Sequence, residues 1–171
     1  MRSSVQGTQL ANDSPLSAQG RFGRLSYAAW TLISSIFFIV ACIAIGFGIH
    51  QMSQREIALS LQFSLFIFFV IGSLYAGFLY FNFIFMIRRL HDRNQSGWLS
   101  LFYIVPPLNL FFIVYLLSAK GNERLNDFGP ARYTCTWERV FGWIYIALIP
   151  VSIIIGILIA VMIPTYQDYL Q

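Results

Sequence analysis

Charged residues are scarce in this chain of 171 residues, and their scarcity excludes the commonest class of protein. Asp, Glu, Lys and Arg make up 11% of the sequence, whereas soluble domains average about 25%. Hydrophobic residues reach 57% and aromatic residues 18%. Because aromatic side chains are enriched where membrane proteins meet the lipid headgroups, the composition predicts an integral membrane protein rather than a soluble domain.

The sequence also lacks the patterns by which most catalytic and metal sites are recognised. Its two cysteines, Cys42 in an apolar run and Cys135 in a polar loop, predict free thiols rather than a disulfide framework. No spacing of His, Cys and carboxylates is typical of a metal site, and no glycine-rich phosphate loop is present. We therefore expect no enzymatic activity, no cofactor, no metal and no nucleic-acid partner.

The first 20 residues are polar and rich in Ser, Gln, Asn and Gly. They have no short apolar stretch of the kind that a cleavable signal peptide needs. A segment with so little to bury is expected to form a disordered tail over residues 1–20.

Four long segments carry no charged residue: Tyr27–Ile49, Ile57–Ile87, Trp98–Ser118 and Val140–Pro164. A helix crosses a bilayer with about 20 apolar residues, and these segments are apolar all round rather than amphipathic. The sequence predicts an all-α integral membrane protein with three to four transmembrane helices.

The third segment leaves two alternatives open, because Pro106 and Pro107 lie at its middle. Two consecutive prolines remove two backbone donors and disfavour a continuous helix. The segment either spans the membrane or forms a re-entrant Pro-Pro hairpin. Each leg of the hairpin would reach only about 12–16 Å at 1.5 Å per residue, so neither leg would cross alone.

The basic residues favour the hairpin. With three spans and a hairpin, ten of the 11 basic residues lie on one side of the membrane and only Arg55 on the other; with four spans they divide six to five. Lys and Arg concentrate in cytoplasmic loops. The favoured arrangement places the N-terminus in the cytoplasm and the C-terminus outside.

The densest charge cluster runs from Arg88 to Trp98, between two uncharged segments. If the preceding helix continues through it, Asp92 can pair with Arg88 at i, i+4 or with Arg89 at i, i+3. Arginines at the membrane surface also bind anionic headgroups. The simplest interpretation is a lipid anchor that fixes topology; an acid–base pair of His91 and Asp92 is the weaker alternative.

Three sequence elements together resemble a known bacterial family. They are Gly20–Tyr27 followed by Trp30, Arg88-Arg89-Leu90-His91-Asp92 with Ser96-Gly97-Trp98, and Asn126-Asp127-Phe128-Gly129-Pro130. They are similar to the family called domain of unknown function 805, which implies a multi-pass protein of the bacterial inner membrane and no particular reaction. The family usually has a basic residue where this chain has Asp127. The resemblance divides the chain into a tail (1–20), a membrane domain (21–131) and an additional helix (132–171).

In the hairpin topology all three elements lie on the cytoplasmic surface, and we expect them to form one polar cap. Its members are Arg21, Arg24, Arg88, Arg89, His91, Asp92, Arg93, Ser96, Gly97, Trp98, Asn126, Asp127, Phe128 and Gly129.

The last apolar segment is similar to the transmembrane helix of type IV pilins, an apolar run that ends in Pro164 and Tyr166-Gln167-Asp168-Tyr169. Gly142 lies where the pilin processing glycine would fall. Trp143 and Ala147 depart from the pilin pattern, which argues against processing. The small residues Gly156 and Ala160 permit close helix contact, so we expect a helix-packing face formed by Gly156, Ala160, Pro164 and Tyr166.

These features suggest two classes of function. The first is a non-enzymatic adaptor or assembly factor, associated with pilin-like helices or other membrane proteins and able to form oligomers. The alternative is a small transporter, pore or lipid-handling protein. The uncharged spans lack the ionisable residues that mark ion pathways, which favours the adaptor.

Overall fold

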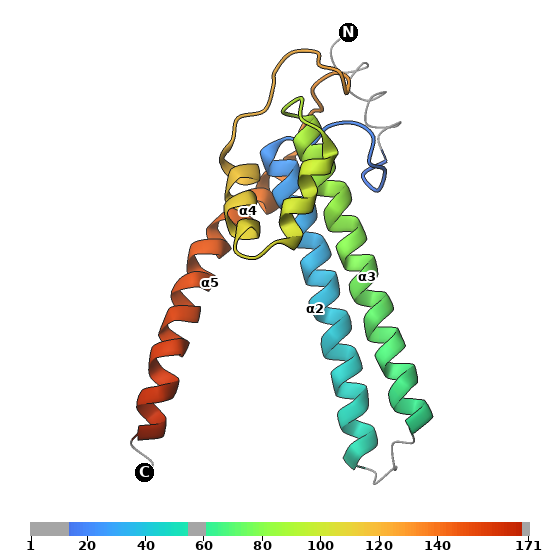
Figure 1. Cartoon of the computed structure of the whole chain (residues 1–171), viewed down its shortest axis with the longest axis vertical. Coiled ribbons are helices and arrows are strands. Elements are labelled where there is room, and N and C mark those ends of the chain that lie inside the picture. Colours follow the sequence, from blue (N-terminus) through green and yellow to red (C-terminus); the bar gives the residue numbers. More distant parts are fainter. Residues whose placement is uncertain (1–13, 55–60, 169–171) are drawn as a thin grey trace.

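The computed structural model describes residues 14–54 and 61–168, and over those residues all regular structure is helical. Three long helices, α2 (Arg24–Gln54), α3 (Leu61–His91) and α5 (Thr136–Asp168), form the body of the molecule (Figure 1). A 3-10 helix, η1 (Gly97–Ile104), and a short α-helix, α4 (Leu108–Ser118), lie at one end. The predicted all-α fold is confirmed.

The long helices have the length and composition of membrane spans. In the part of the chain that the structure describes, three helical stretches qualify: Arg24–Met52, Leu61–His91 and Thr136–Ile163. Even the shortest, with 28 residues, reaches about 42 Å, against a hydrocarbon thickness of about 30 Å. The chain is therefore a multi-pass membrane protein.

The third apolar segment is not a continuous helix. Helix η1 ends at Ile104 and α4 begins at Leu108, and a cis Pro106–Pro107 bond lies between them. The two short helices pack against each other, beside the beginning of α2 and the end of α3 (Figure 1). Of the two alternatives raised by the sequence, the structure adopts the hairpin, because two adjacent residues without backbone N–H groups cannot continue a helical ladder.

Helix α3 continues past its uncharged run and so carries Arg88 and Arg89 into the end of the bundle. Asn94 then adopts a left-handed conformation with a φ of 57°. The N–H of Gln95 donates to the carbonyl of Leu90, and that of Asn94 donates to the carbonyl of His91. This is the Schellman pattern that satisfies the last carbonyls of a helix. It turns the chain directly into η1.

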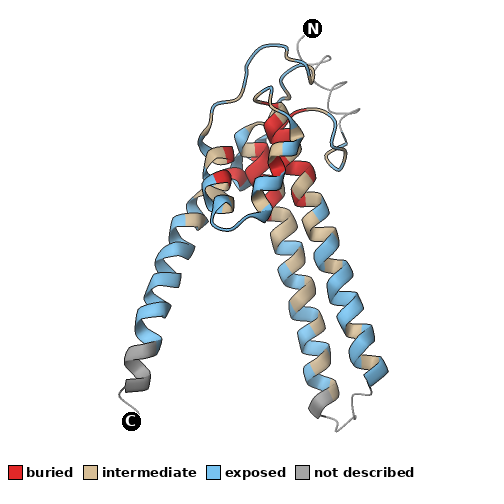
Figure 2. Cartoon of the chain, in the orientation of Figure 1, coloured by how far each residue is buried: buried red, intermediate tan, exposed pale blue. Residues whose placement is uncertain are grey.

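The buried side chains gather at the end of the molecule that holds η1 and α4 (Figure 2). The apolar core there is formed by Phe22, Tyr27, Ile84, Phe85, Met86, Leu90, Phe112 and Leu116. Away from this end the long helices expose large apolar side chains along most of their length. Such surfaces suit hydrocarbon rather than water as the surrounding medium.

Helix α5 packs against α2 only near its beginning and then diverges from it (Figure 1). Gly142 marks the crossing point: a Cβ atom there would lie 2.6 Å from the carbonyl oxygen of Leu25. The two backbones can approach this closely only because glycine has no side chain. Gly142, which lies where a pilin processing glycine would fall, therefore has a packing role in this fold.

Candidate functional site

Asp92 is the centre of the polar cap. Its Oδ1 atom accepts hydrogen bonds from Nε of Arg21 at 3.2 Å and from Nη2 at 3.0 Å. Its Oδ2 atom accepts a hydrogen bond from Nη1 of Arg89 at 2.5 Å. Asp92 is 6% exposed, Arg21 1% and Arg89 0%. One carboxylate thus joins the segment before α2 to the end of α3, within a site closed to water.

Arg21 also binds the loop that follows α4. Its Nη1 atom donates to the carbonyls of Arg124 at 2.8 Å and Gly129 at 2.9 Å, and Nη2 donates to the carbonyl of Asn122. An arginine presents five N–H donors in a fixed plane, and here they link three chain segments. All of these hydrogen-bond partners of the Arg21 guanidinium belong to the protein itself.

Arg89 fixes the end of α4 in the same way. Its Nε atom donates to the carbonyl of Leu116 at 2.8 Å, and its Nη2 atom donates to the carbonyl of Ala119. The last carbonyls of a helix lack intrahelical partners, so a buried cation placed there satisfies them. The sequence allowed Asp92 to pair with Arg88 or with Arg89, and the structure forms the pair with Arg89.

Gly121 leaves room for this arrangement. A Cβ atom at Gly121 would lie 1.9 Å from Oδ2 of Asp92 and 3.3 Å from Nη1 of Arg89. The backbone of the loop therefore covers the ion pair directly. This close cover explains how two arginines and a carboxylate stay buried beside the core.

Arg88 holds the described part of the N-terminal segment against α3. Its guanidinium lies 4.0 Å from the ring centre of Phe22, and its Nη1 atom donates to the carbonyls of Ser14 at 2.6 Å and Ser17 at 3.3 Å. Residues 14–20 of the tail that the sequence predicts to be disordered are thus bound to the cap. Residues 1–13 lie outside the described residues.

The loop element Asn126–Pro130 meets His91. The amide nitrogen of Asn126 donates to the carbonyl of His91 at 2.8 Å. The rings of His91 and Phe128 stack with their centres 3.8 Å apart and their planes 5° apart. Gly129 has a φ of 106°, a conformation that favours glycine, and it closes the turn. The structure therefore brings the three sequence elements together at one end of the molecule.

The remaining predicted members lie at the margin of the cap. Nδ2 of Asn94 donates to Oδ2 of Asp127 at 3.0 Å, and Arg93 lies over the ring of Tyr115. Arg24 is exposed, with a long contact of 3.5 Å to the carbonyl of Ser118. Ser96, Gly97 and Trp98 start η1, where the hydroxyl of Ser96 accepts a hydrogen bond from the N–H of Trp98.

Glu138 is a buried charge that the sequence reasoning missed. It is 0% exposed and accepts hydrogen bonds from Nη1 of Arg132 at 2.9 Å, from the hydroxyl of Ser26 at 3.0 Å and from Nε1 of Trp30 at 2.9 Å. It also accepts a hydrogen bond from the backbone N–H of Cys135, one residue before α5 begins. A Glu in the first turn that bonds back to the cap residue is a known start signal for a helix, and this was the available clue.

Other acidic groups contrast with these buried ones. The side chains of Lys120 and Glu123 form an ion pair of 2.8 Å in which both are 78% exposed. The hydrogen bond from Lys120, together with its charge, holds the pKa of Glu123 below its usual range. Among the described residues, no group of three or more His, Cys, Asp or Glu is placed to hold a metal ion. Both cysteines are free.

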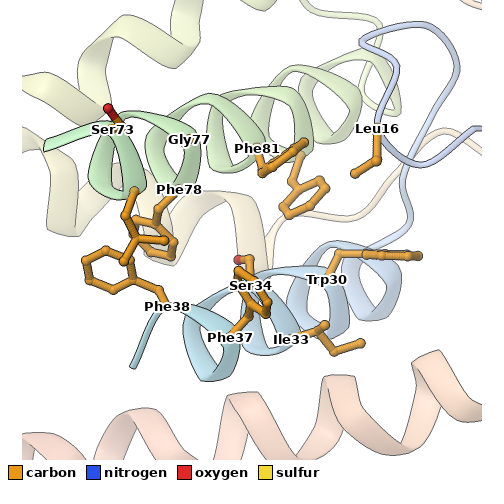
Figure 3. A pocket seen from close by; sticks show the side chains of 12 residues that line it. Leu16, Trp30, Ile33, Ser34, Phe37, Phe38, Ser73, Gly77, Phe78 and Phe81 are labelled. Carbon is orange, nitrogen blue, oxygen red and sulfur yellow. The ribbon is translucent and has the colours of Figure 1, made fainter. Parts of the chain in front are cut away.

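An apolar groove lies between α2 and α3, below the cap (Figure 3). It encloses about 420 Å³ and is bordered by aromatic rings, with Leu16 of the N-terminal segment at one end. The rings include Trp30, Phe37, Phe38, Phe78 and Phe81. Its described lining carries no charged side chain, so the groove suits hydrocarbon and not a polar substrate.

The predicted helix-packing face is described only in part. Gly156 and Ala160 are exposed on α5, and a Cβ atom at Gly156 would meet nothing within 4 Å. The side chains of Pro164 and Tyr166 lie outside the described ones. The pilin-like character of this face stays a prediction.

Comparison with known proteins yields a family match. A protein-family profile described as protein of unknown function (DUF805) matches residues 15–130. No curated protein and no solved structure matches the chain. The matched range covers the three charged elements of the cap and ends before α5.

Proposed function

The chain belongs to the DUF805 family of proteins of unknown function, and we propose that it is a non-enzymatic membrane adaptor whose helix α5 binds a transmembrane helix of a partner protein. Family membership supplies no reaction. The proposal therefore depends on how this chain uses its polar groups and its helices.

The observation that carries the proposal is the isolation of α5. Helix α5 packs against α2 at Gly142 and Glu138, yet every residue from Pro150 to Ile163 is exposed (Figures 1 and 2). Lipid tails are as apolar as leucine, so helices associate in membranes through close packing at small residues. Gly156 and Ala160 offer such a site, four residues apart on one face.

The polar chemistry of the protein supports an adaptor over an enzyme or a transporter. Asp92 and Glu138 are each bound to arginine and covered by protein. Asn82, a polar residue within a span, is buried and donates to the carbonyl of Phe78 in its own helix at 2.8 Å. Polar groups within spans mark ion or substrate pathways when they face a cavity. The side chains of Asp92, Glu138 and Asn82 instead bind other groups of the protein.

The charge pattern supports a bacterial inner-membrane location with the cap in the cytoplasm. Three spans and a hairpin leave ten basic residues on the side of the cap, as the positive-inside rule prefers. Arg21, Arg88 and Arg89 are buried, so anionic headgroups would bind the exposed Arg24, Lys120, Arg124 and Arg139 instead. A reporter fused after Gln171 should be active outside the cytoplasm; activity inside would contradict this orientation.

A crosslinking scan along α5 tests the adaptor proposal. A photoreactive residue is placed at each position from 153 to 161 in cells, and captured proteins are identified by mass spectrometry. We expect one membrane protein to be captured with a period of three to four residues, strongest beside Gly156 and Ala160, because one helix face would contact the partner. A partner with a pilin-type helix would support that branch of the proposal.

The control for the scan is the substitution Gly156→Ile, which adds bulk to the face without filling any space inside the protein. Capture should fall sharply in this variant while the protein remains folded. Equal capture at all positions would indicate nonspecific contact without a preferred face, and the absence of any protein adduct would indicate that α5 faces lipid only. Either outcome would contradict the proposal.

A further inference from the structure

A second groove lies between α3 and η1, beside the cap, and encloses about 810 Å³. Its lining combines apolar and polar side chains. The apolar ones include Phe83 and Ile87 of α3 and Leu101 of η1. The polar ones include His91 at the end of α3, Asn94 and Ser96 between α3 and η1, and Asp127 in the loop after α4. An amphipathic groove of this kind matches a molecule that is itself apolar at one end and polar at the other.

The position of the groove coincides with the edge of the membrane. The apolar residues Phe83 and Ile87 lie in the last turns of a candidate span, whereas the polar residues Asn94, Ser96 and Asp127 lie in the loops of the cap. Trp98 lines the groove and is 79% exposed. Tryptophan with such exposure is typical of the headgroup level of a bilayer. The groove therefore crosses the boundary between hydrocarbon and headgroups.

Asp127 gives the polar end a negative charge. Among the carboxylates whose side chains the structure describes, Asp127 alone forms no ion pair with Lys or Arg: Asp92, Glu123 and Glu138 all do. Asn94 fixes its position, because Nδ2 of Asn94 donates to the carboxylate at 3.0 Å and Oδ1 of Asn94 accepts from the N–H of Asp127 at 3.2 Å. No Lys or Arg is among the described residues that line the groove. Its charge thus fits a cation and disfavours an anionic headgroup.

We propose that the α3–η1 groove binds a phospholipid whose headgroup carries a primary ammonium, as in phosphatidylethanolamine. An acyl chain lies along Phe83, Ile87 and Leu101, and the ammonium donates a hydrogen bond to Asp127. The hydroxyl of Ser96 accepts a hydrogen bond from the N–H of Trp98, so its own proton can be donated to a phosphate oxygen. This inference is independent of the partner proposed for α5.

Quenching of Trp98 fluorescence by lipids with brominated acyl chains tests the proposal. The purified full chain, in a micelle of uncharged detergent at pH 8, is titrated with brominated phosphatidylethanolamine, phosphatidylcholine or phosphatidylglycerol. The variant Trp98→Phe identifies the part of the signal that belongs to the groove. Choline has no N–H to donate. Phosphatidylethanolamine should therefore bind about tenfold more tightly than phosphatidylcholine, as one added charge-assisted hydrogen bond predicts.

Two isosteric variants complete the test. Asp127→Asn should remove the preference for phosphatidylethanolamine, whereas Glu123→Gln, on the same loop but outside the groove, should keep it. Equal quenching by the ethanolamine and choline lipids, or a preference that survives Asp127→Asn, would overturn the proposal. So would strongest quenching by phosphatidylglycerol, which would reveal an anionic lipid site, or a signal unchanged in Trp98→Phe, which would place the lipid elsewhere.

Discussion

Replacing Asp92 with asparagine is expected to destabilise the folded protein by about 3–5 kcal/mol, the usual cost of removing one partner from a buried ion pair. The side chains of Arg21 and Arg89 are both 0% exposed. An asparagine keeps the shape of Asp92 but loses the charge, and its NH₂ group opposes a guanidinium N–H. Both arginines would stay buried without a counter-ion. Because the free energy of unfolding of native proteins is only about 5–15 kcal/mol, this single substitution should remove a large part of it.

The measurement is the unfolding midpoint of the purified protein in detergent, compared with that of Asp127→Asn. This control makes the same chemical change at an exposed carboxylate of the neighbouring loop, and it should cost at most about 0.5 kcal/mol. A double-mutant cycle with Arg21→Met should show strong coupling to Asp92. Equal midpoints for Asp92→Asn and Asp127→Asn would mean that the buried pair contributes nothing.

Replacing Glu138 with glutamine is expected to release the beginning of α5 from α2, at a cost of about 3 kcal/mol. A glutamine retains one acceptor oxygen, whereas Glu138 accepts from Arg132, Ser26, Trp30 and the N–H of Cys135. The loss should be local, because the Asp92 cluster does not share a partner with Glu138 in the described bonds.

The two native cysteines report this opening. Cys135 lies one residue before the start of α5, and Cys42 lies within α2. A loss of about 3 kcal/mol raises the population of the open form more than about a hundredfold, so thiol labelling of Cys135 should accelerate strongly in Glu138→Gln while that of Cys42 stays unchanged. Glu123→Gln serves as the control, because exposed ion pairs contribute about 0–1 kcal/mol. Acceleration at both cysteines would indicate global unfolding and contradict a local role.

The sequence predicted the helices and the gathering of the cap for one physical reason: both follow from the avoidance of charge in hydrocarbon. The runs without charge become spans, and the basic residues between them fall on one side. The consecutive residues Pro106 and Pro107, together with the charge count, also favoured the hairpin that the structure contains.

The ion-pair and hydrogen-bond partners of individual charged side chains could not be predicted from the sequence in this way. Spacing along a helix allowed Asp92 either arginine, and only the fold decides that Arg21, from a distant segment, joins Arg89 there. Most arginine donors in the cap meet backbone carbonyls, which carry no residue-specific signal. Glu138 was missed because one acidic residue before an apolar run is also what a helix at the membrane surface would have.

The hydrogen bonds of Glu138 show that the range matched by the family profile and the folding unit of this protein end at different residues. Ser26 and Trp30 lie inside the range matched by the family profile, whereas Glu138, whose carboxylate accepts their hydrogen bonds, lies beyond the end of that range at residue 130. A chain cut there, or joined there to another helix, would leave a hydroxyl and an indole N–H of α2 without their acceptor. In this protein the folding unit is therefore longer than the range matched by the family profile. Helix α5 belongs to the folding unit although it lies outside that range.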